Sequence, residues 1–333
     1  MIIWLWLGFL AIIFILLALD LGVFNRHAHV ITVREALKWT AVWVAVAMAF
    51  NVLLYFMYEN HWFGIGMTVG HQLDGADAAI KFFTGYIVEK SLSMDNIFVI
   101  AVIFGYFKVP PQYQHRVLFW GILGALIMRG GMIAVGTVMI RSFSWTIYIF
   151  GGLLIITAVR MLMSGDEHGD PNNNWLTRLA KRFYPVAEGF DGQKFFTIVN
   201  GKRAMTRLMI VLLVVESTDV LFAVDSIPAI FAITDDPFIV FTSNVFAILG
   251  LRSLYFALAG MIDKFRYLKP SLVFVLAFVG VKMIISHHYP IPTLVSLSVI
   301  LGILLVGVLA SIFSPVVRNA PVHEMVEEEV ETK

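Results

Sequence analysis

The 333-residue sequence has no cysteine and little charge, since only 14% of its residues are Asp, Glu, Lys or Arg. The missing cysteines exclude disulfides, thiolate metal sites and dithiol electron transfer within the chain. Soluble globular domains carry about 25% charged residues, so the low charged fraction argues against that class. A net charge of +1 provides no basic footprint for a nucleic-acid partner. The sequence is instead 59% hydrophobic, which predicts a polytopic membrane protein.

Long apolar runs are the main feature of the sequence. Windows of about 20 residues, the length of helix that crosses a bilayer, predict an all-α membrane protein with about nine transmembrane helices. The first run lacks a basic start and a clear cleavage site, so we expect it to be retained. We place the chain in the bacterial inner membrane as a multi-pass protein. The runs are 2–24, 36–58, 78–107, 117–140, 144–163, 207–233, 238–261, 271–286 and 293–313.

Basic residues lie in alternate loops between these runs. Lys and Arg accumulate on the cytoplasmic side of membrane proteins, so the alternation predicts an outside N-terminus and a cytoplasmic C-terminus, and only Arg141 departs from it. The opposite loops are acidic or contain histidine. We expect them to be solvated, with an exit vestibule for a cation as the alternative. The residues concerned are His61, His71, Asp74, Asp77, Asp235 and Asp236.

The chain divides into a transmembrane domain over 1–313, a cytoplasmic loop within it over 164–206, and an acidic tail over 314–333. In the loop, apolar and basic residues at helical spacing over 175–184 predict a helix that lies on the anionic inner leaflet. Residues 194–205 predict a small hairpin that turns at Asn200-Gly201. The tail is predicted to be disordered.

Acidic residues inside two apolar runs are the strongest functional signal. One run contains Glu216, Asp219 and Asp225, and another contains Glu89 and Asp95. An ionised carboxylate at the bilayer centre costs about 2.5–3.5 kcal/mol, so these groups require partners, protons or a cation. Intramembrane acids therefore predict a functional site.

The two acid-bearing runs are related by a weak internal repeat. An ungapped offset of 127 places Glu89 on Glu216 and Pro110 on Pro237. Because an odd number of crossings separates the repeats, they run in opposite directions, as the inverted repeats of secondary transporters do, with substrate bound between them near the midplane. The repeats comprise spans three to five and six to eight, about 78–163 and 207–286.

Helix geometry limits how these acids meet. Glu216 and Asp219 are three residues apart and share a helix face, whereas Asp225 lies nine residues beyond Glu216, about 13.5 Å along the axis and on the opposite face. A straight helix cannot bring all three to one ion. Serine, threonine and proline near the acids therefore predict broken helices at 92–96 and 224–228, with freed carbonyls as further ligands.

The kinds of ligand determine which ion such a site favours. Carboxylate, amide, hydroxyl and carbonyl oxygens suit Mn²⁺, Ca²⁺ and Mg²⁺, whereas zinc and copper more often recruit Cys or His. The sequence has no Cys, and no His lies deep in a predicted span. Met94 near the acids favours Mn²⁺, the softest of the three ions, as the substrate. The surplus of acids indicates that some of them bind protons, which would couple metal movement to protons.

Two motifs resemble one known family. Glu-Lys-x-Leu-Ser-x-Asp-Asn at 89–96 and Glu-Ser-Thr-Asp-Val-Leu-Phe-Ala-Val-Asp-Ser-Ile-Pro at 216–228 resemble the paired signature of TerC-family membrane proteins, close to the alkaline-induced Alx branch. The resemblance covers nearly the whole chain. It implies membership of the lysine-exporter superfamily, export of Mn²⁺ from the cytoplasm and a link to alkaline pH. The metal-handling residues that it implies are Glu89, Asp95, Asn96, Glu216, Asp219 and Asp225.

Other polar residues in the runs are assigned gating or supporting roles. We expect Arg129 and Arg252 to neutralise acids of the site and Lys90 to pair with an acid. Asn residues in the runs are expected to join helices by hydrogen bonds. The set is Asp20, Lys90, Ser93, Ser226, Asn51, Asn244, Arg129 and Arg252. In the alternative reading, the acids pair with Arg129, Arg252, Lys282 or Lys90 only to fix helix packing.

Several functions are compatible with these features. We predict a secondary transporter that exports Mn²⁺, coupled to protons. An exporter of a cationic amino acid is the alternative, and it would need an elongated cavity with an apolar wall. A membrane partner that supplies metal to secreted proteins without transporting it by itself is a further role. An intramembrane hydrolase lacks support, because the sequence has no His-Glu-x-x-His or Gly-x-Gly-Asp motif, so we do not expect an enzyme. The oligomeric state is not specified.

Overall fold

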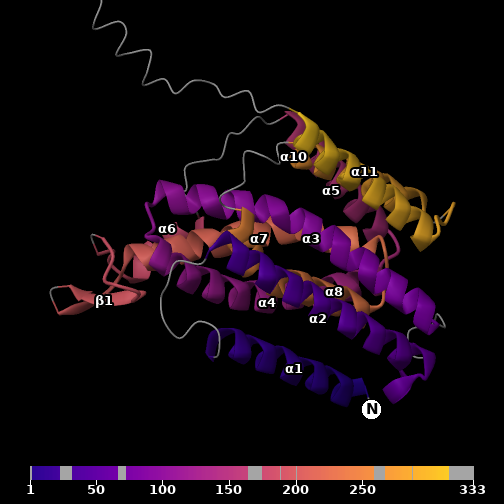
Figure 1. Ribbon diagram of the computed structural model, residues 1–333, viewed down its shortest axis with the longest axis horizontal. Helices are drawn as coiled ribbons and strands as arrows, with labels where there is room; N and C mark the ends of the chain where they lie inside the picture. The colour runs from indigo at the N-terminus through magenta and orange to yellow at the C-terminus, as the bar shows by residue number, and fades with distance from the viewer. Residues whose placement is uncertain are drawn as a thin grey trace, which may run out of the picture.

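The computed structural model describes residues 2–22, 32–66, 73–163, 175–187, 189–199, 201–258, 267–286 and 288–314 (Figure 1). The helices are α1 (Ile2–Gly22), α2 (Val33–Glu59), α3 (Gly75–Tyr106), α4 (Pro111–Ser142), α5 (Thr146–Met163), α6 (Trp175–Phe183), α7 (Arg207–Phe231), α8 (Pro237–Leu249), α9 (Leu251–Leu258), α10 (Leu268–Ile285) and α11 (Thr293–Phe313). A short 3-10 helix, η1 (Trp62–Gly64), and the strands β1 (Phe196–Val199) and β2 (Lys202–Met205) complete the described elements. Of the predicted tail, 315–333 lies outside the described residues.

Each predicted apolar run coincides with a helix, or in one case with the bent pair α8 and α9. Among the described residues, five helices are long and apolar enough to cross a membrane, and the bent pair makes a sixth candidate. Helices α3 and α7 are also long, at 32 and 25 residues, but they contain the charged side chains discussed above. The described chain is thus a helical multi-span membrane protein. The count of nine crossings and their orientation stay predictions.

The helices pack in pairs that the proposed repeat relates to each other. α3 packs against α8, α4 packs against α7, and α5 packs against α10. In the proposed repeat, α3 corresponds to α7, α4 to α8 and α5 to α10. The pair α3–α8 is then equivalent to the pair α7–α4, and the pair α5–α10 is equivalent to itself. The inversion of the repeats stays a prediction. Figure 1 shows α5, α10 and α11 together on one flank and α1 on the other. Between these flanks, the acid-bearing helices α3 and α7 are in contact.

Apolar side chains surround the polar part of this contact. Ile100 of α3 and Val215 of α7 belong to one buried cluster, and Val88 of α3 and Ile227 of α7 belong to another. Both helices are continuous between these positions, so the acids lie between two apolar layers. These layers therefore enclose the polar contact between α3 and α7 at both ends.

The predicted breaks at 92–96 and 224–228 are wrong, because α3 and α7 run through both segments without interruption. The hydroxyl groups bond within their own helix instead of replacing its backbone bonds, and Ser91 Oγ, for example, donates to Ile87 O at 2.7 Å. Such bonds to the preceding turn are compatible with a continuous helix. Pro228 lies in the last turn of α7, so the backbone donor that it lacks has little helix left to interrupt.

The break that does occur lies at Gly250, where the axes of α8 and α9 differ by 41°. Lys90 Nζ of α3 donates to Ala247 O in the last turn of α8 at 3.1 Å, and it makes this bond in place of the predicted ion pair with an acid. A cation is favourable there because the final carbonyls of a helix carry partial negative charge. A Cβ at position 250 would meet Lys90 Nζ at 2.8 Å and Trp43 Cβ at 3.2 Å. Glycine therefore permits the close approach of α2 and α3 to the bend.

The segment between α5 and α7 contains a helix and a hairpin at the positions where the sequence places them. α6 contacts α7, and β1 pairs with β2 in antiparallel fashion, with Phe196 opposite Met205 and Val199 opposite Lys202. Gly201 in the turn has a φ of +75°, which glycine adopts without the strain that a Cβ would cause.

One acid of the predicted solvated loops is buried. Asp235 is exposed, as expected, but Asp236 is only 1% exposed. Asp236 Oδ1 accepts hydrogen bonds from the backbone N–H groups of Phe238 at 2.9 Å and Ile239 at 3.2 Å, so it caps the start of α8. Burial raises the pKa of the Asp236 carboxyl above its ordinary value. The Asp-Pro sequence before an apolar run was the signal for this cap.

Candidate functional site

Arg129 of α4 lies at the centre of a buried polar cluster, with only 2% of its side chain exposed. Its Nη1 donates to Glu89 Oε1 of α3 and, at 3.3 Å, to Ser226 Oγ of α7. Asp219 of α7 accepts from the other side of the guanidinium, with Nη2 to Oδ1 at 2.8 Å and Nε to Oδ2 at 3.1 Å. Two parallel bonds of this kind fix both the distance and the orientation of the pair. One guanidinium thus joins three helices.

Two further residues of α3 extend the cluster. Asn96 Nδ2 donates to Asp219 Oδ1 at 3.4 Å, and Ser93 Oγ lies 3.5 Å from Glu89 Oε1. Glu89, Ser93 and Asn96 follow each other at spacings of four and three residues, which places them on one face of α3. The cluster therefore combines one face of α3 with one face of α7 around the arginine of α4.

Three buried oxygens at this site have no hydrogen-bond partner among the described residues: Glu89 Oε2, Asn96 Oδ1 and Glu216 Oε2. Glu216 lies one helical turn before Asp219 and packs so tightly against Gly124 of α4 that a Cβ there would collide with its carboxyl group. Arg129 pairs with Glu89 and Asp219, while Glu216 has no ion pair within the described part of the chain. Buried polar atoms without partners are rare, and they mark positions for a proton, a water molecule or an ion.

The remaining acids of the predicted metal set lie apart from this cluster. Asp225 accepts a hydrogen bond from Thr157 Oγ1 of α5 at 2.7 Å, because the continuous α7 turns it away from the face of Glu216 and Asp219. Asp95 is half-buried on α3, six residues beyond Glu89 and therefore on another face of that helix. Within the described ranges, no three Asp, Glu, His or Cys side chains could hold one metal ion. The six predicted metal residues are thus not one group in this arrangement.

The predicted supporting residues have diverse surroundings. Ser93, Ser226 and Arg129 belong to the cluster. Asn51 Oδ1 and both polar side-chain atoms of Asn244 are buried without a hydrogen-bond partner in the described part of the chain, so the expected interhelical bonds of these three atoms are not formed there. Arg252, at 6% exposed, lines a cavity next to the cluster. The side chain of Asp20 lies outside the described residues.

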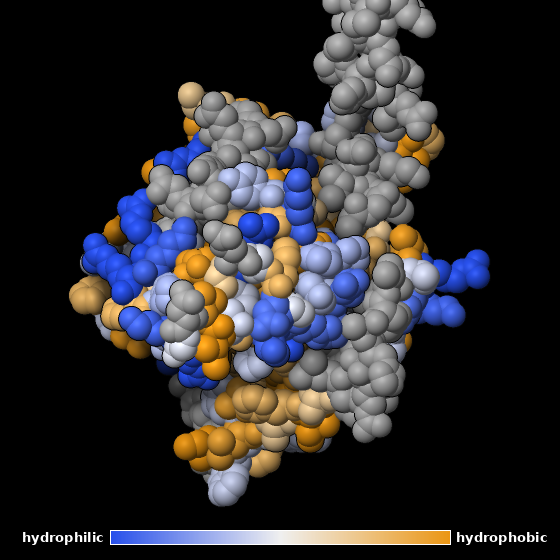
Figure 2. Space-filling view, turned by 90° about the vertical axis from the view of Figure 1, so that its left-hand side faces the viewer, coloured by the Kyte–Doolittle hydropathy of each residue, from blue (hydrophilic) through white to orange (hydrophobic). Residues whose placement is uncertain are grey.

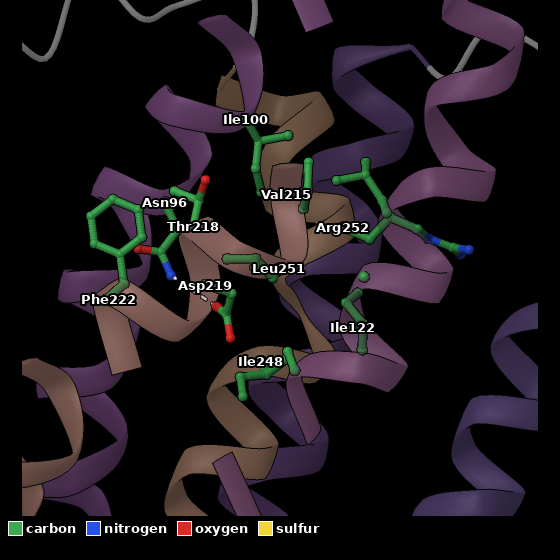
Figure 3. Close-up of a pocket in the computed structure, with 13 residues that line it drawn as sticks. Asn96, Ile100, Ile122, Val215, Thr218, Asp219, Phe222, Ile248, Leu251 and Arg252 are labelled. Atoms are coloured by element: carbon green, nitrogen blue, oxygen red, sulfur yellow. Dashed lines mark hydrogen bonds between the residues drawn. The ribbon is translucent and has the colours of Figure 1, made fainter. Parts of the chain in front are cut away.

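This cavity is open on one side, and the empty space between its side chains is about 450 Å³ only when the open solvent at its mouth is counted; Figure 3 shows the side chains around it. Its walls are mostly apolar, with Ile122, Val215 and Leu251 among them. The carboxyl group of Asp219 reaches into this region, whereas the guanidinium of Arg252 points away from it (Figure 3). The cavity therefore presents a carboxylate beside an apolar wall. Its full lining is Asn96, Ile100, Leu118, Gly121, Ile122, Ala125, Val215, Thr218, Asp219, Phe222, Ile248, Leu251 and Arg252.

Two neighbours of the predicted acids were not predicted from the sequence. Gly124 gives Glu216 its space, and Thr157 binds Asp225. A single glycine or threonine in an apolar run has many structural explanations, so neither carried a signal by itself. A charge count that searched for partners of Asp225 across the helices would still have missed Thr157, because it is neutral.

Comparison with known proteins places these helices in a family. The profile described as "Integral membrane protein TerC family" matches residues 74–319, which include α3, α4 and α7 and so the whole Arg129 cluster. The chain belongs to the TerC family. No solved structure matches this TerC protein.

Relatives of this TerC protein match it over almost their full length. An uncharacterized membrane protein of Myxococcus xanthus is 49% identical over 320 residues, which is 96% of this chain and 95% of the relative. A protein of Escherichia coli strain K12, named Alx and described provisionally as a membrane-bound redox modulator, is 44% identical over 301 residues, 90% of this chain and 91% of the relative. An uncharacterized membrane protein of Rickettsia bellii is 40% identical over 307 residues, 92% of this chain and 96% of the relative.

Proposed function

We propose that this TerC-family protein is a secondary transporter that exports Mn²⁺ from the cytoplasm through the cluster around Arg129, with protons as the coupling ion. The observation that supports it is the excess of acid in the cluster. Arg129 pairs with Glu89 and Asp219, while Glu216 on the same face of α7 has a buried oxygen without a partner among the described residues. An uncompensated acid inside a membrane is costly, and a cation or a proton relieves that cost.

Mn²⁺ suits the chemistry of these groups. Carboxylate, amide and hydroxyl oxygens from α3 and α7 line the cluster, and oxygen ligands select ions such as Mn²⁺, Ca²⁺ and Mg²⁺. The choice of Mn²⁺ among them follows the resemblance of the two motifs and the nearby Met94.

In this proposal, Arg129 is a tethered cation that the transported ion displaces. The guanidinium and a divalent ion beside the same two carboxylates would repel each other strongly in a medium of low dielectric constant. Ion entry therefore requires Arg129 to withdraw from Glu89 and Asp219. The described arrangement, with no three acids gathered around one point, corresponds to the state in which the arginine occupies the site.

Purified protein in liposomes provides the test. We expect wild-type vesicles to move Mn²⁺ without any other protein, and to do so faster when a pH gradient is imposed. Glu89→Gln, Asp219→Asn and Glu216→Gln should each reduce the rate at least tenfold, because each removes a charge that compensates the ion. Asp235→Asn is the matched control, since Asp235 is an exposed acid away from the cluster, and it should transport at the wild-type rate.

Two outcomes would contradict the proposal. Wild-type vesicles that hold folded protein but do not move Mn²⁺ would favour a partner that supplies metal without transporting it. Full transport by Glu89→Gln and Asp219→Asn would show that the ion takes another route.

A cationic amino acid is the second candidate substrate, and the cavity favours it. Asp219 could bind an amino group while the apolar wall, with Val215 and Ile122, contacts an aliphatic side chain. Ala125→Leu would fill part of this cavity. A lysine exporter should lose lysine transport in this variant, whereas a metal exporter should retain most of its Mn²⁺ transport.

The description of the Escherichia coli relative as a redox modulator has a limited bearing on this chain. The sequence has no cysteine, so the chain has no thiol of its own for such a role. Under the proposal, an influence on redox state would act through the ions that the protein moves.

A further inference from the structure

The segment formed by α6 and the β1–β2 hairpin exposes large apolar side chains. Ile198 of β1 is 75% exposed and Phe183 at the end of α6 is 73% exposed. Leu179, Tyr184 and Val186 are each more than 40% exposed as well. Side chains of this size are normally covered in a stable protein, so their grouping on one segment indicates a surface that is covered by something else.

Apolar and basic groups share one face of the hairpin. Phe196 and Ile198 are two residues apart in β1 and therefore point to the same side. Arg203 is the partner of Ile198 in the register, and its guanidinium lies 5.6 Å from the centre of the Phe196 ring. Tyr184, just after α6, packs edge-on against the same ring at 5.6 Å. This face is thus a continuous surface of aromatic, aliphatic and basic groups.

Contacts with α4 hold the base of the hairpin against the first turns of that helix, and the hairpin extends from there at one end of the molecule (Figure 1). Phe195, next to β1, lies 6.4 Å from the ring of Trp120 and 5.1 Å from the guanidinium of Arg116. Trp120 comes nine residues after the start of α4, about 13 Å along the helix axis. Its indole is 44% exposed on the flank of a candidate membrane span. Tryptophan prefers the headgroup layer, so the base of the hairpin, at Phe195, is expected near the level of that layer.

The charge of the segment complements an anionic surface. Residues 175–206 contain six basic residues and two acidic ones. One of the acids, Asp191, accepts hydrogen bonds from Thr197 at 2.8 Å and Lys194 at 3.3 Å, and these bonds hold the pKa of its carboxyl below the ordinary value. Figure 2 views this end of the molecule and shows hydrophilic and hydrophobic side chains next to each other. Basic groups beside apolar ones are the pattern of segments that bind a membrane interface.

We propose that the face formed by Phe183, Tyr184, Ile198 and Arg203 docks onto the anionic headgroup layer of the same membrane that holds the helices. The apolar side chains would enter the layer and the basic ones would contact lipid phosphates. This docking would hold the start of α4 and the start of α7 at a fixed depth, because the hairpin bonds to both: Phe195 contacts α4, and Thr206 after β2 begins α7.

The absence of native cysteine makes the test direct. We would introduce Ile198→Cys alone, attach a nitroxide, and reconstitute the full-length protein in vesicles of phosphatidylcholine with phosphatidylglycerol. Val199→Cys is the matched control, because neighbouring residues of a strand point to opposite sides. Both side chains are exposed, so neither substitution should prevent folding. We expect the probe at 198 to collide several-fold more with oxygen, which is enriched in lipid, than with a water-soluble nickel chelate, and the probe at 199 to show the reverse.

The proposal also predicts a dependence on lipid charge. In vesicles of phosphatidylcholine alone, the lipid signature of the probe at 198 should weaken several-fold, since the basic groups lose their partners. Equal access of the nickel chelate to both probes in anionic vesicles would overturn the proposal. Protection of position 198 in native membranes, but not in anionic vesicles of purified protein, would also overturn it and indicate a protein partner.

Discussion

At the scale of residues, the charge of Arg129 dominates the candidate site. Removing a guanidinium and its carboxylates from water costs several kcal/mol for each group, and well-aligned hydrogen bonds between them offset part of this cost. The two bonds to Asp219 and the bond to Glu89 do so. Removing one charged partner should lower the stability of the fold more than replacing all of the partners by neutral groups, because the remaining charges stay buried without compensation.

Arg129→Met should therefore destabilise the protein by about 3–5 kcal/mol. The triple variant Arg129→Met, Glu89→Gln, Asp219→Asn should recover a large part of this loss, since no buried charge of the group then remains. Thermal unfolding in detergent measures both. Arg141→Met, an exposed arginine of the same helix, is the control and should unfold like the wild type. An unchanged unfolding temperature for Arg129→Met would show that the acids are protonated in the folded protein.

Gly124 provides a second residue-scale prediction. Gly124→Ala would push a methyl group into the carboxyl of Glu216, and overpacking of this kind costs about 1–3 kcal/mol. We expect transport to fall more than stability, because Glu216 must move to accommodate the methyl group. Gly131→Ala in the same helix meets nothing within 4 Å and should be neutral or stabilising by up to about 1 kcal/mol. Equal behaviour of the two variants would rule out a tight contact at Gly124.

The sequence predicted the importance of the acids but not their grouping. Glu89 and Asp219 were identified because charge in an apolar run is costly, and that cost depends on the sequence alone, whereas Asn96 was identified from the resemblance of the motif at 89–96. Their convergence on Arg129 depends on which faces of α3, α4 and α7 meet, which no local pattern specifies. Asp225 was placed with them because α7 was expected to break, and its continuous helix directs Asp225 to Thr157 instead.

At the scale of elements, the helices are continuous at the serine and threonine residues near the acids and bend at a glycine instead. Ser and Thr near the acids bond to their own helix and leave α3 and α7 straight enough to count as single helices. The chain bends at Gly250 instead, where α2 and α3 approach closely enough that an added Cβ would contact Lys90 and Trp43. The sequence contains both kinds of residue, and only the packing of the helices shows that the bend occurs at the glycine.

The cap of α8 yields a prediction on pH. Asp236 has a pKa raised by burial, so its contribution to stability is present below the ordinary pKa of an aspartate and is lost as the pH rises through the raised value. In Asp236→Asn, the amide oxygen can still cap the helix, and this loss of stability with rising pH should disappear. Unfolding midpoints across that pH range measure the difference. Asp235→Asn, an exposed neighbour, should keep the wild-type slope, and an unchanged slope in Asp236→Asn would refute the cause.

At the scale of the whole molecule, the apolar runs predicted the positions of the helices well, because a bilayer crossing requires a long apolar segment. The internal repeat stays a prediction, with which the packing of α3 on α8, α4 on α7 and α5 on α10 is compatible. The direction of each crossing rests on loop charge alone and needs its own measurement.

Single cysteines provide that measurement. We expect Lys194→Cys to react with an impermeant maleimide from the cytoplasmic side only, and Asp235→Cys from the opposite side only, because basic loops stay inside. Both positions are exposed, and the chain has no other thiol. Spheroplasts and inverted vesicles present the two sides separately. Labelling of both cysteines from one side would change the number of crossings between them.

In the proposed transporter, the positive charge of Arg129 also affects how the protein returns to its starting state after it releases the ion. After releasing its ion, a transporter with only acidic groups at its site must bind another cation or keep uncompensated carboxylates in the apolar part of the membrane, which is costly. Here the side chain of Arg129 would fold back between Glu89 and Asp219 and neutralise them. Glu216, with which Arg129 forms no ion pair in the described part of the chain, would then bind the proton that the proposal uses for coupling, so the unloaded form would reset with a proton and without sodium or potassium.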